Sequence, residues 1–455
     1  MKDVIHMGGG GGFWGDALDP ASDMLKGTQQ LDYLAFDFLA ELTMALLQRQ
    51  KLKTPDLGFV PDAVTYADAL MKDAREKGTR LISNGGGANP KAAGQRIAEA
   101  AARQGLGGTK IGVVEGDDIL SRLDDFMAQG VSFANFETGE DNFKALRNRV
   151  VSANVYTDST GIVESLGSGA DIVVTGRVSD NALFVGPIIH EFGWKHDAAH
   201  ADKIGAAITV GHVVECAAGC TGGMSSRWAE MPHMGRVGFP TIEFHQNGEA
   251  VISKIAGSGG RVDEFTIKEH LLYEIGDPRR YTMPDGVADF TAVRVKQEGS
   301  DRVRLSGMRG TPQPDTFKVV IGYHDGWIGE GMLFFPWPDA LGRAQKAKDT
   351  LLERFERLGL ISEAVHFDFV GVDMLHGPAA PKLTYEPNEI GLRVAVKTRD
   401  REEAEKVRRA CAQLWIMGPG GTAFGTPMKP RPVIAAWPAL VPKELVKQSV
   451  EILVA

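Results

Sequence analysis

Three acidic side chains stand close together where one apolar run of the chain ends. Glu115, Asp117 and Asp118 lie in the stretch VVEGDD, which closes the run 110–115. Crowded carboxylates raise one another's pKa, so one of them can hold a proton for acid–base work, and their oxygens also suit a hard cation. The alternative is that Asp117 or Asp118 caps a helix at 119–126. We take Glu115 and Asp117 as candidate catalytic residues and Asp118 as a candidate substrate-binding residue.

A second group of reactive side chains lies in GHVVECAAGC. If this segment is helical, His212 and Cys216 share one face, and Glu215 lies beside them. Such a group suits a metal ion or an activated thiolate, whereas a cysteine in a helix of small residues is ordinarily packed in the core. The spacing of Cys216 and Cys220 is not that of a usual zinc knuckle, and no second ligand pair is evident, so we assign no metal. His212, Glu215 and Cys216 are further catalytic candidates.

The glycine run near the start of the chain is a candidate anion site. Gly10, Gly11 and Gly12 leave the backbone open to a ligand and offer N–H groups to a phosphate or carboxylate. The run contains the pattern G-x-G-x-x-G, but a dinucleotide site also needs an acidic residue that closes the second strand. Asp37 suits that role poorly, because apolar residues continue on both sides of it. A purely structural turn remains the alternative, and Asp16 either faces the ligand or caps the next helix.

Two more polar loops follow apolar runs. In SNGGGANP, Asn84 and Gly86 are candidates for holding a ligand, and Asn89 is either a ligand-binding residue or the N-cap of the helix that begins at the next proline. In TGRVSD, Arg177 can grip a carboxylate or phosphate with two hydrogen bonds. Its alternative is an internal ion pair with Asp180, which we also count as a candidate binding residue.

Lys254 precedes a third loop of small residues at 257–260, where it either binds phosphate or is solvated. No G-x-S-x-G elbow is present, so a serine triad of the hydrolase type is not indicated.

These loops need elements that bring them together, and the first half of the chain alternates apolar runs with helical stretches. Such alternation predicts an α/β fold with a doubly wound, mostly parallel sheet, in which the loops at the carboxyl ends of the strands form the binding crevice. The expected strands are residues 4–7, 32–38, 79–83, 110–115 and 170–175, with a crossover helix at 91–104.

The second half has a different pattern and predicts a mixed α+β lobe. The pair Asn247-Gly248 between two apolar runs indicates a hairpin at 237–255. We place one domain at 1–235 and the other at 236–455. The further elements expected in the second lobe are a turn near residue 299 within 288–307, two β runs in 316–335 joined by HDGW, helices at 339–358 and 402–417, and strands at 366–372 and 391–398.

Composition excludes several classes of protein. With 59 acidic and 50 basic residues and no clustered basic run, the chain does not resemble a nucleic-acid binder. No stretch approaches the about 20 apolar residues of a membrane span, and no secretory signal is evident. Three cysteines cannot form a disulfide framework in 455 residues. We therefore expect a cytoplasmic protein.

Several stretches of the chain resemble the acyclic terpene utilisation protein family. They occur in order over nearly the whole chain, and they are GGGGFWGD, LDYLAFDFLAE, SNGGGANP, VVEGDD, ADIVVTGRVSD, GHVVECAAGCTGG, GSGGRV, LLYEIGDP, DTFKVVIGYHDGWIGEG and WPALVP.

The resemblance implies a role in bacterial catabolism of acyclic terpenes such as citronellol and geraniol, or of related branched acids, through coenzyme A thioesters. One reaction that it suggests is lyase action on a branched 3-hydroxyglutaryl-CoA type intermediate, with release of acetate or its thioester. Longer members of the family continue into a further small domain of about 100 residues. The resemblance therefore implies that a separate small subunit partners this chain in an oligomer.

These expectations combine into one hypothesis and two alternatives. We expect a lyase or hydratase acting on a branched carboxylate or acyl-CoA, with coenzyme A present only as part of the substrate. The glycine loops and Arg177 would hold the anion, and Glu115, Asp117 or His212 would move a proton. The alternatives are a nicotinamide-dependent oxidoreductase and a non-catalytic, thioester-binding subunit of a complex.

Overall fold

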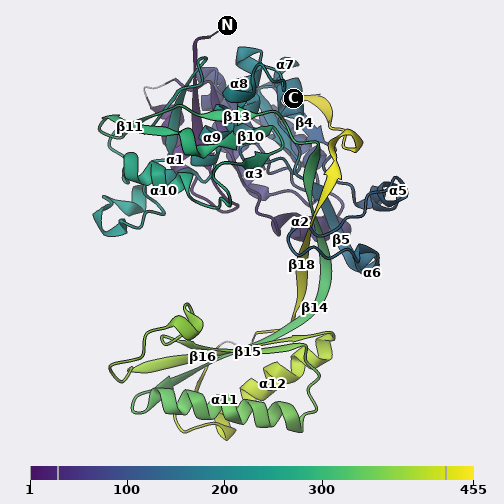
Figure 1. Cartoon of the computed structure of the whole chain (residues 1–455), viewed down its shortest axis with the longest axis vertical. Helices are drawn as coiled ribbons and strands as arrows, with labels where there is room; N and C mark the ends of the chain where they lie inside the picture. The colour runs from purple at the N-terminus through teal and green to yellow at the C-terminus, as the bar shows by residue number, and fades with distance from the viewer. Residues whose placement is uncertain (1, 28–29, 426–427) are drawn as a thin grey trace. The chain divides into compact units, whose positions relative to one another are not determined.

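The computed structural model describes residues 2–27, 30–425 and 428–455 (Figure 1). The chain divides into two compact units. Unit 1 comprises Met1–Gly322 and Ala436–Ala455, and unit 2 comprises Tyr323–Ala435.

Five parallel strands form the centre of unit 1 and confirm the predicted α/β fold. Their order in the sheet is β1, β2, β3, β6, β4, and each neighbouring pair is parallel. All five carboxyl ends therefore lie at one edge of the sheet, where the polar loops follow. The bounds are β1 (Val4–Gly11), β2 (Tyr33–Phe36), β3 (Arg80–Ser83), β6 (Ile172–Thr175) and β4 (Lys110–Glu115).

Antiparallel strands extend this sheet on both sides. The hairpin predicted around Asn247 is confirmed as β7 (Pro240–His245) and β8 (Ala250–Lys254), and β7 pairs with β1. Beyond β8 lie β12 (Arg302–Ser306) and β11 (Arg294–Gly299), and β19 (Ser449–Val454) pairs with β4 at the other edge.

The boundary expected at residue 235 does not coincide with the observed division of the chain. The hairpin continues the sheet of unit 1, and its side chains Ile242, Phe244 and Ile252 join the same hydrophobic core as helices before residue 235. Burying this apolar face against the existing core explains why the hairpin adds to unit 1 instead of starting a new one.

Helices cover both faces of the parallel sheet. In β2 the side chains of Leu34 and Phe36 join one core, and those of Tyr33 and Ala35 join the other, as the two-residue period of a strand requires. The first core is shared by α1 (Asp19–Lys26), α2 (Thr43–Lys53), α3 (Pro61–Lys77) and α4 (Pro90–Arg103), and the second by α7 (Thr160–Gly167), α8 (Ala182–Phe192) and α9 (Ala201–Val214). The predicted doubly wound arrangement follows from this alternation.

A small three-stranded sheet packs on α9. It consists of β9 (Tyr281–Met283), β10 (Gly286–Asp289) and β13 (Arg309–Thr311), with β10 in the middle. Gly205 of α9 lies so close to β13 that a Cβ atom there would stand 2.5 Å from the Arg309 carbonyl oxygen. The glycine therefore sets the distance between the helix and this sheet.

The remaining elements of unit 1 are short. They include β5 (Val150–Val155), which was not among the expected strands, together with α5 (Leu123–Ala128), α6 (Phe143–Leu146) and α10 (Glu264–Leu271).

Unit 2 is an antiparallel sheet with two helices. Along β14 (Thr316–Pro336), two separate β runs were expected, but one strand is observed. Gly326 adopts φ 88° and lies against the Thr398 carbonyl, so the HDGW segment bends the strand without turning it back. Figure 1 shows both helices on one face of the sheet. The other elements of unit 2 are β15 (Ala364–Val370), β16 (Glu389–Thr398), β17 (Ala423–Phe424), α11 (Ala340–Arg357) and α12 (Arg401–Met417). The strands β14 and β18 (Arg431–Pro442) each belong partly to unit 1 and partly to unit 2.

Within the described ranges, no helix is both long enough and apolar enough to cross a membrane.

Two glycine-to-alanine substitutions in helices should have opposite effects on stability. In Gly205→Ala the new methyl group meets the β13 backbone, so we expect the free energy of unfolding to fall by about 1–3 kcal/mol. In Gly167→Ala no atom lies within 4 Å of the new methyl group, and alanine's helix propensity should leave stability unchanged or raise it by up to about 1 kcal/mol. Urea denaturation of both variants tests this; equal effects would contradict the proposed close contact.

Candidate functional site

A buried arginine lies at the carboxyl edge of the parallel sheet. Arg177 follows β6, and its side chain is 1% exposed. One guanidinium nitrogen donates to the Leu39 carbonyl oxygen at 2.7 Å, and another donates to Asp180. The guanidinium carbon lies 3.9 Å from the centre of the Tyr156 ring. Arg177 is therefore held on three sides, while its Nε has no hydrogen-bond partner among the described residues.

A buried acid–amide pair lies at the ends of β2 and β3. The Asn84 amide donates to Asp37 Oδ1 at 2.6 Å and accepts from the Phe38 backbone N–H at 2.8 Å. Burial raises the pKa of Asp37 well above its usual range, the Asp180 carboxylate raises it further, and Arg177 acts in the opposite sense. Asn84 was expected to hold a ligand; instead both of these bonds position Asp37 and its loop.

A third acid reaches this edge from the end of α9. Glu215 is 7% exposed, and its Oε1 lies 3.4 Å from His212 Nδ1. The Tyr281 hydroxyl lies 3.2 Å from the same nitrogen. Burial raises the pKa of Glu215 well above its usual range, with further increases from the charges of Asp180 and Glu274. Burial lowers the pKa of His212 to about 4, so this imidazole is neutral at pH 7.

Asp37, Asp180, Glu215 and Arg177, here called the Arg177 cluster, bring three carboxyl groups to one buried cation. Three negative charges beside a single positive charge in a buried site are costly, so with Asp180 paired to Arg177 the surroundings favour the protonated forms of Asp37 and Glu215. Glu215 Oε2 and His212 Nε2 have no hydrogen-bond partner in the described part of the chain. The cluster therefore combines acids whose burial favours the protonated form with unused polar atoms, which is an arrangement suited to proton transfer.

Asp117 lies next to the backbone of Gly176 and Arg177, at the turn that leads into the Arg177 cluster. Its Oδ2 accepts from the Asn154 amide at 2.8 Å, and its carboxylate also accepts from the Arg177 backbone N–H. A Cβ atom on Gly176 would stand 2.1 Å from Asp117 Oδ1, so the close approach requires glycine. Burial raises the pKa of Asp117 to about 7. This geometry makes Asp117 a positioning residue for the turn that carries Arg177.

The five-glycine run is largely strand instead of the expected loop, because β1 continues to Gly11. A Cβ atom on Gly10 would stand 2.5 Å from the Phe36 ring, and one on Gly12 would stand 2.8 Å from the Cys216 backbone. Protein packing thus accounts for Gly10 and Gly12, and nothing in these contacts favours a nicotinamide dinucleotide. Asp16 closes the run by accepting from the Gly12 N–H at 2.8 Å.

Cys216 lies between this run and Glu215. Burial and the neighbouring Glu215 raise the pKa of its thiol, which is the opposite of what an activated thiolate needs. Its backbone contact with Gly12 gives Cys216 a packing role.

Several of the candidate residues are engaged in local contacts outside the cluster. Glu115 ends β4 and pairs with Ser449 of β19. Asp118 is exposed and accepts from the Leu120 N–H, which is the capping alternative. Lys254 donates to the Ser258 carbonyl at 2.9 Å and pairs with Asp301.

Asn89 precedes α4 as expected, but its side chain caps no N–H and donates to the Pro55 and Leu57 carbonyls. Gly86 packs against the Thr175 carbonyl, where a Cβ atom would stand 2.5 Å away, and Gly11 pairs with Phe36 of β2. These positions therefore shape the loops around the cluster.

Three residues that the structure brings to the site were not among the candidates. Asp37 had a signal in the sequence, because an acid with apolar neighbours on both sides directly after a strand is a buried acid. Tyr156 and Tyr281 follow β5 and begin β9, far along the chain, and no local pattern marks them.

The cavity that touches Arg177 has a volume of about 10 Å³, which is room for about one water molecule. Among the residues that the structure describes, no group of three or more His, Cys, Asp or Glu side chains is arranged to hold a metal ion.

Replacing Asp117 by asparagine should reveal its raised pKa. The unfolded chain ionises near pH 4, whereas the folded protein resists ionisation until about pH 7, so ionisation destabilises the wild type as the pH rises between these values. The new amide would keep an acceptor for the Asn154 side chain without that cost. The stability of Asp117→Asn relative to wild type should therefore increase from pH 4 to pH 7, by at most roughly 3–4 kcal/mol, and then level off.

Urea denaturation of both proteins between pH 4 and pH 8 measures this difference. Asp125→Asn, at an exposed position in α5, is the matched control and should show no such trend. A difference for Asp117→Asn that does not change with pH would contradict the raised pKa.

Comparison with known proteins gives one match. The family model described as acyclic terpene utilisation family protein AtuA covers residues 5–452. No curated protein and no solved structure matches the chain. The match to this family model spans nearly all of the 455 residues and includes every element around the Arg177 cluster, so the chain belongs to the acyclic terpene utilisation family.

Proposed function

We propose that the protein is an acid–base lyase or hydratase that acts on a branched carboxylate or its coenzyme A thioester during acyclic terpene utilisation. The observation that carries this proposal is Glu215, a buried carboxyl group whose burial raises its pKa well above the usual range and which has one unused oxygen in the Arg177 cluster. The family membership supports a substrate that arises during acyclic terpene utilisation, and the carboxylate or thioester is part of the proposal.

Such reactions break or form a bond next to a carbonyl group and pass through an enolate. A carboxylic acid that stays neutral at pH 7 can donate a hydrogen bond, or its proton, to that developing negative charge. Glu215 is suited to this role because burial raises its pKa and so favours the protonated form. His212 contacts the other oxygen of Glu215 and orients the carboxyl group, so we assign His212 a positioning role.

Arg177 provides the positive charge for the substrate's carboxylate or thioester oxygen. Two of its nitrogens are bound to Leu39 and Asp180, and Nε is unused. The cavity beside Arg177 holds about one water molecule, so in this proposal a neighbouring segment moves to admit the substrate. Leu39 and Glu41 belong to the segment between β2 and α2 that lies against Arg177, so we propose that this segment moves on binding.

Glu215→Gln tests the proposed proton donor. Glutamine keeps the shape and one hydrogen bond but cannot transfer a proton, so we expect kcat to fall by about 10²–10⁴-fold. The wild type and variant are incubated with branched 3-hydroxy acids and their coenzyme A thioesters, and cleavage or loss of water is followed by mass spectrometry.

Glu164→Gln is the matched control, because Glu164 is exposed on α7 and outside the site. This variant should keep the wild-type rate. If Glu215→Gln were as active as Glu164→Gln, Glu215 would not be the proton donor and the acid–base proposal would fail.

A further inference from the structure

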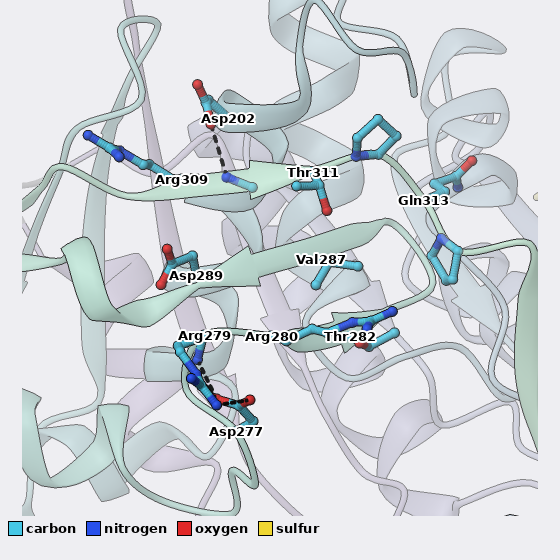
Figure 2. Close-up of a pocket in the computed structure, with 13 residues that line it drawn as sticks. Asp202, Asp277, Arg279, Arg280, Thr282, Val287, Asp289, Arg309, Thr311 and Gln313 are labelled. Atoms are coloured by element: carbon cyan, nitrogen blue, oxygen red, sulfur yellow. Dashed lines mark hydrogen bonds and ion pairs between the residues drawn. The ribbon is translucent and has the colours of Figure 1, made fainter.

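A second, open pocket of about 670 Å³ lies on the three-stranded sheet of unit 1, and its lining shares no residue with the Arg177 cluster. Figure 2 shows that side chains of all three strands face it, with Arg309 from β13, Asp289 and Val287 from β10, and Thr282 from β9. This volume lies within the range of small-molecule sites, roughly 300–1,000 Å³.

The alternation of side chains along β9 separates this pocket from the buried site. Tyr281 points inward and contacts His212, whereas its neighbours Arg280 and Thr282 line the pocket. In the same register, Ala288 is buried between Tyr281 and Gly310, and Gly310 packs against Gly205 of α9. The inner face of the small sheet is thus occupied by protein, and only its outer face is open to a ligand.

The arginines of the pocket include unused hydrogen-bond donors. Arg280 and Arg309 form no side-chain hydrogen bond or ion pair within the described residues, and both are exposed. Arg279 differs, because two of its guanidinium nitrogens donate to Asp277 at 3.0 Å each. Since β9 and β13 both flank β10, the backbones at Arg280 and Arg309 are two strand spacings apart, about 10 Å. Figure 2 shows the two side chains extending toward opposite sides, so one ligand binds both only when these exposed arginines turn toward it.

The acids of the pocket provide unused acceptors. Asp202 Oδ1 accepts from the Gly310 N–H at 3.1 Å, and Asp289 Oδ1 accepts from Thr291. The second oxygen of each carboxylate has no hydrogen bond in the described part of the chain. Three arginines and three aspartates give the lining no net charge, so the pocket does not select an anion by charge alone.

We propose that this pocket binds a nucleoside diphosphate. The phosphates suit the unused guanidinium groups of Arg280 and Arg309, and the ribose hydroxyls suit the unused carboxylate oxygens of Asp202 and Asp289. The base would pack on the apolar surface of Val287 and Pro312. A ligand with both hydrogen-bond donors and anionic acceptors matches a lining that is neutral but rich in both kinds of partner.

Calorimetric titration of the full chain with ADP, GDP, UDP, CDP, adenosine and pyrophosphate tests the proposal without turnover, so the result does not depend on the proposed reaction. We expect at least one nucleoside diphosphate to bind with a Kd below about 1 mM and at least about 10-fold more tightly than pyrophosphate or adenosine. Absence of binding by all four nucleotides would overturn the proposal, and so would pyrophosphate binding as tightly as the best nucleotide.

The double variant Arg280→Ala/Arg309→Ala should weaken nucleotide binding at least about 10-fold, because both charge-assisted phosphate contacts are lost. Its control is Arg294→Ala/Arg357→Ala, which removes the same charge at two exposed arginines outside the pocket and should bind like the wild type. Asp202→Asn keeps the acceptor for Gly310 but loses a charge, and it should weaken nucleotide binding while leaving pyrophosphate binding unchanged or stronger. Equal affinities of the pocket and control double variants would place the nucleotide elsewhere and overturn the assignment.

Discussion

A positive charge that is almost fully buried destabilises a protein unless nearby groups replace its lost contacts with water. Arg177 is such a charge, and residues at the carboxyl edge of the parallel sheet in unit 1 provide these contacts. Removing one partner from a buried ion pair ordinarily destabilises a protein by about 3–5 kcal/mol, because a charge is left without compensation. Arg177 has an ion pair with Asp180, a carbonyl oxygen from Leu39 and the face of the Tyr156 ring. These partners come from the segments that follow β2, β5 and β6, so the charge of one side chain ties three strands together at the site.

The parallel order of the central strands makes this compensation feasible. Because β2, β3 and β6 are neighbours, Asp37, Asn84 and Arg177 leave the sheet at adjacent points of one edge. Asn84 then fixes Asp37, and Asp117 fixes the turn that carries Arg177. The positions of Asp37 and Arg177 thus depend on hydrogen bonds with Asn84 and Asp117.

The sequence predicts these strands well because each is a short apolar run closed by polar residues, and the run at 110–115 coincides with β4. The hairpin around Asn247 is equally clear, since its turn residues and alternation agree. The division of the chain into units is not predictable in this way. Whether a hairpin joins an existing core depends on which apolar surface of the rest of the fold is free to pack against it, and the local sequence pattern does not contain that information. The same reason explains Tyr156 and Tyr281, which reach the site only through tertiary packing. Asp37 was a different case: its apolar neighbours argued against a cofactor-binding role, and the structure shows that the same neighbours accompany a buried acid.

The balance of charge at the Arg177 cluster also bears on its chemistry. A divalent cation needs ionised oxygens, yet Asp37 and Glu215 are acids whose surroundings favour the protonated form. The cluster already contains a fixed positive charge, which would repel a second cation in a buried site. Under the proposed function, a substrate with a negative charge would be attracted by Arg177 and would lie beside acids whose surroundings favour the protonated form. The electrostatics of these residues therefore favour proton transfer to an anionic substrate over the binding of a hard metal ion.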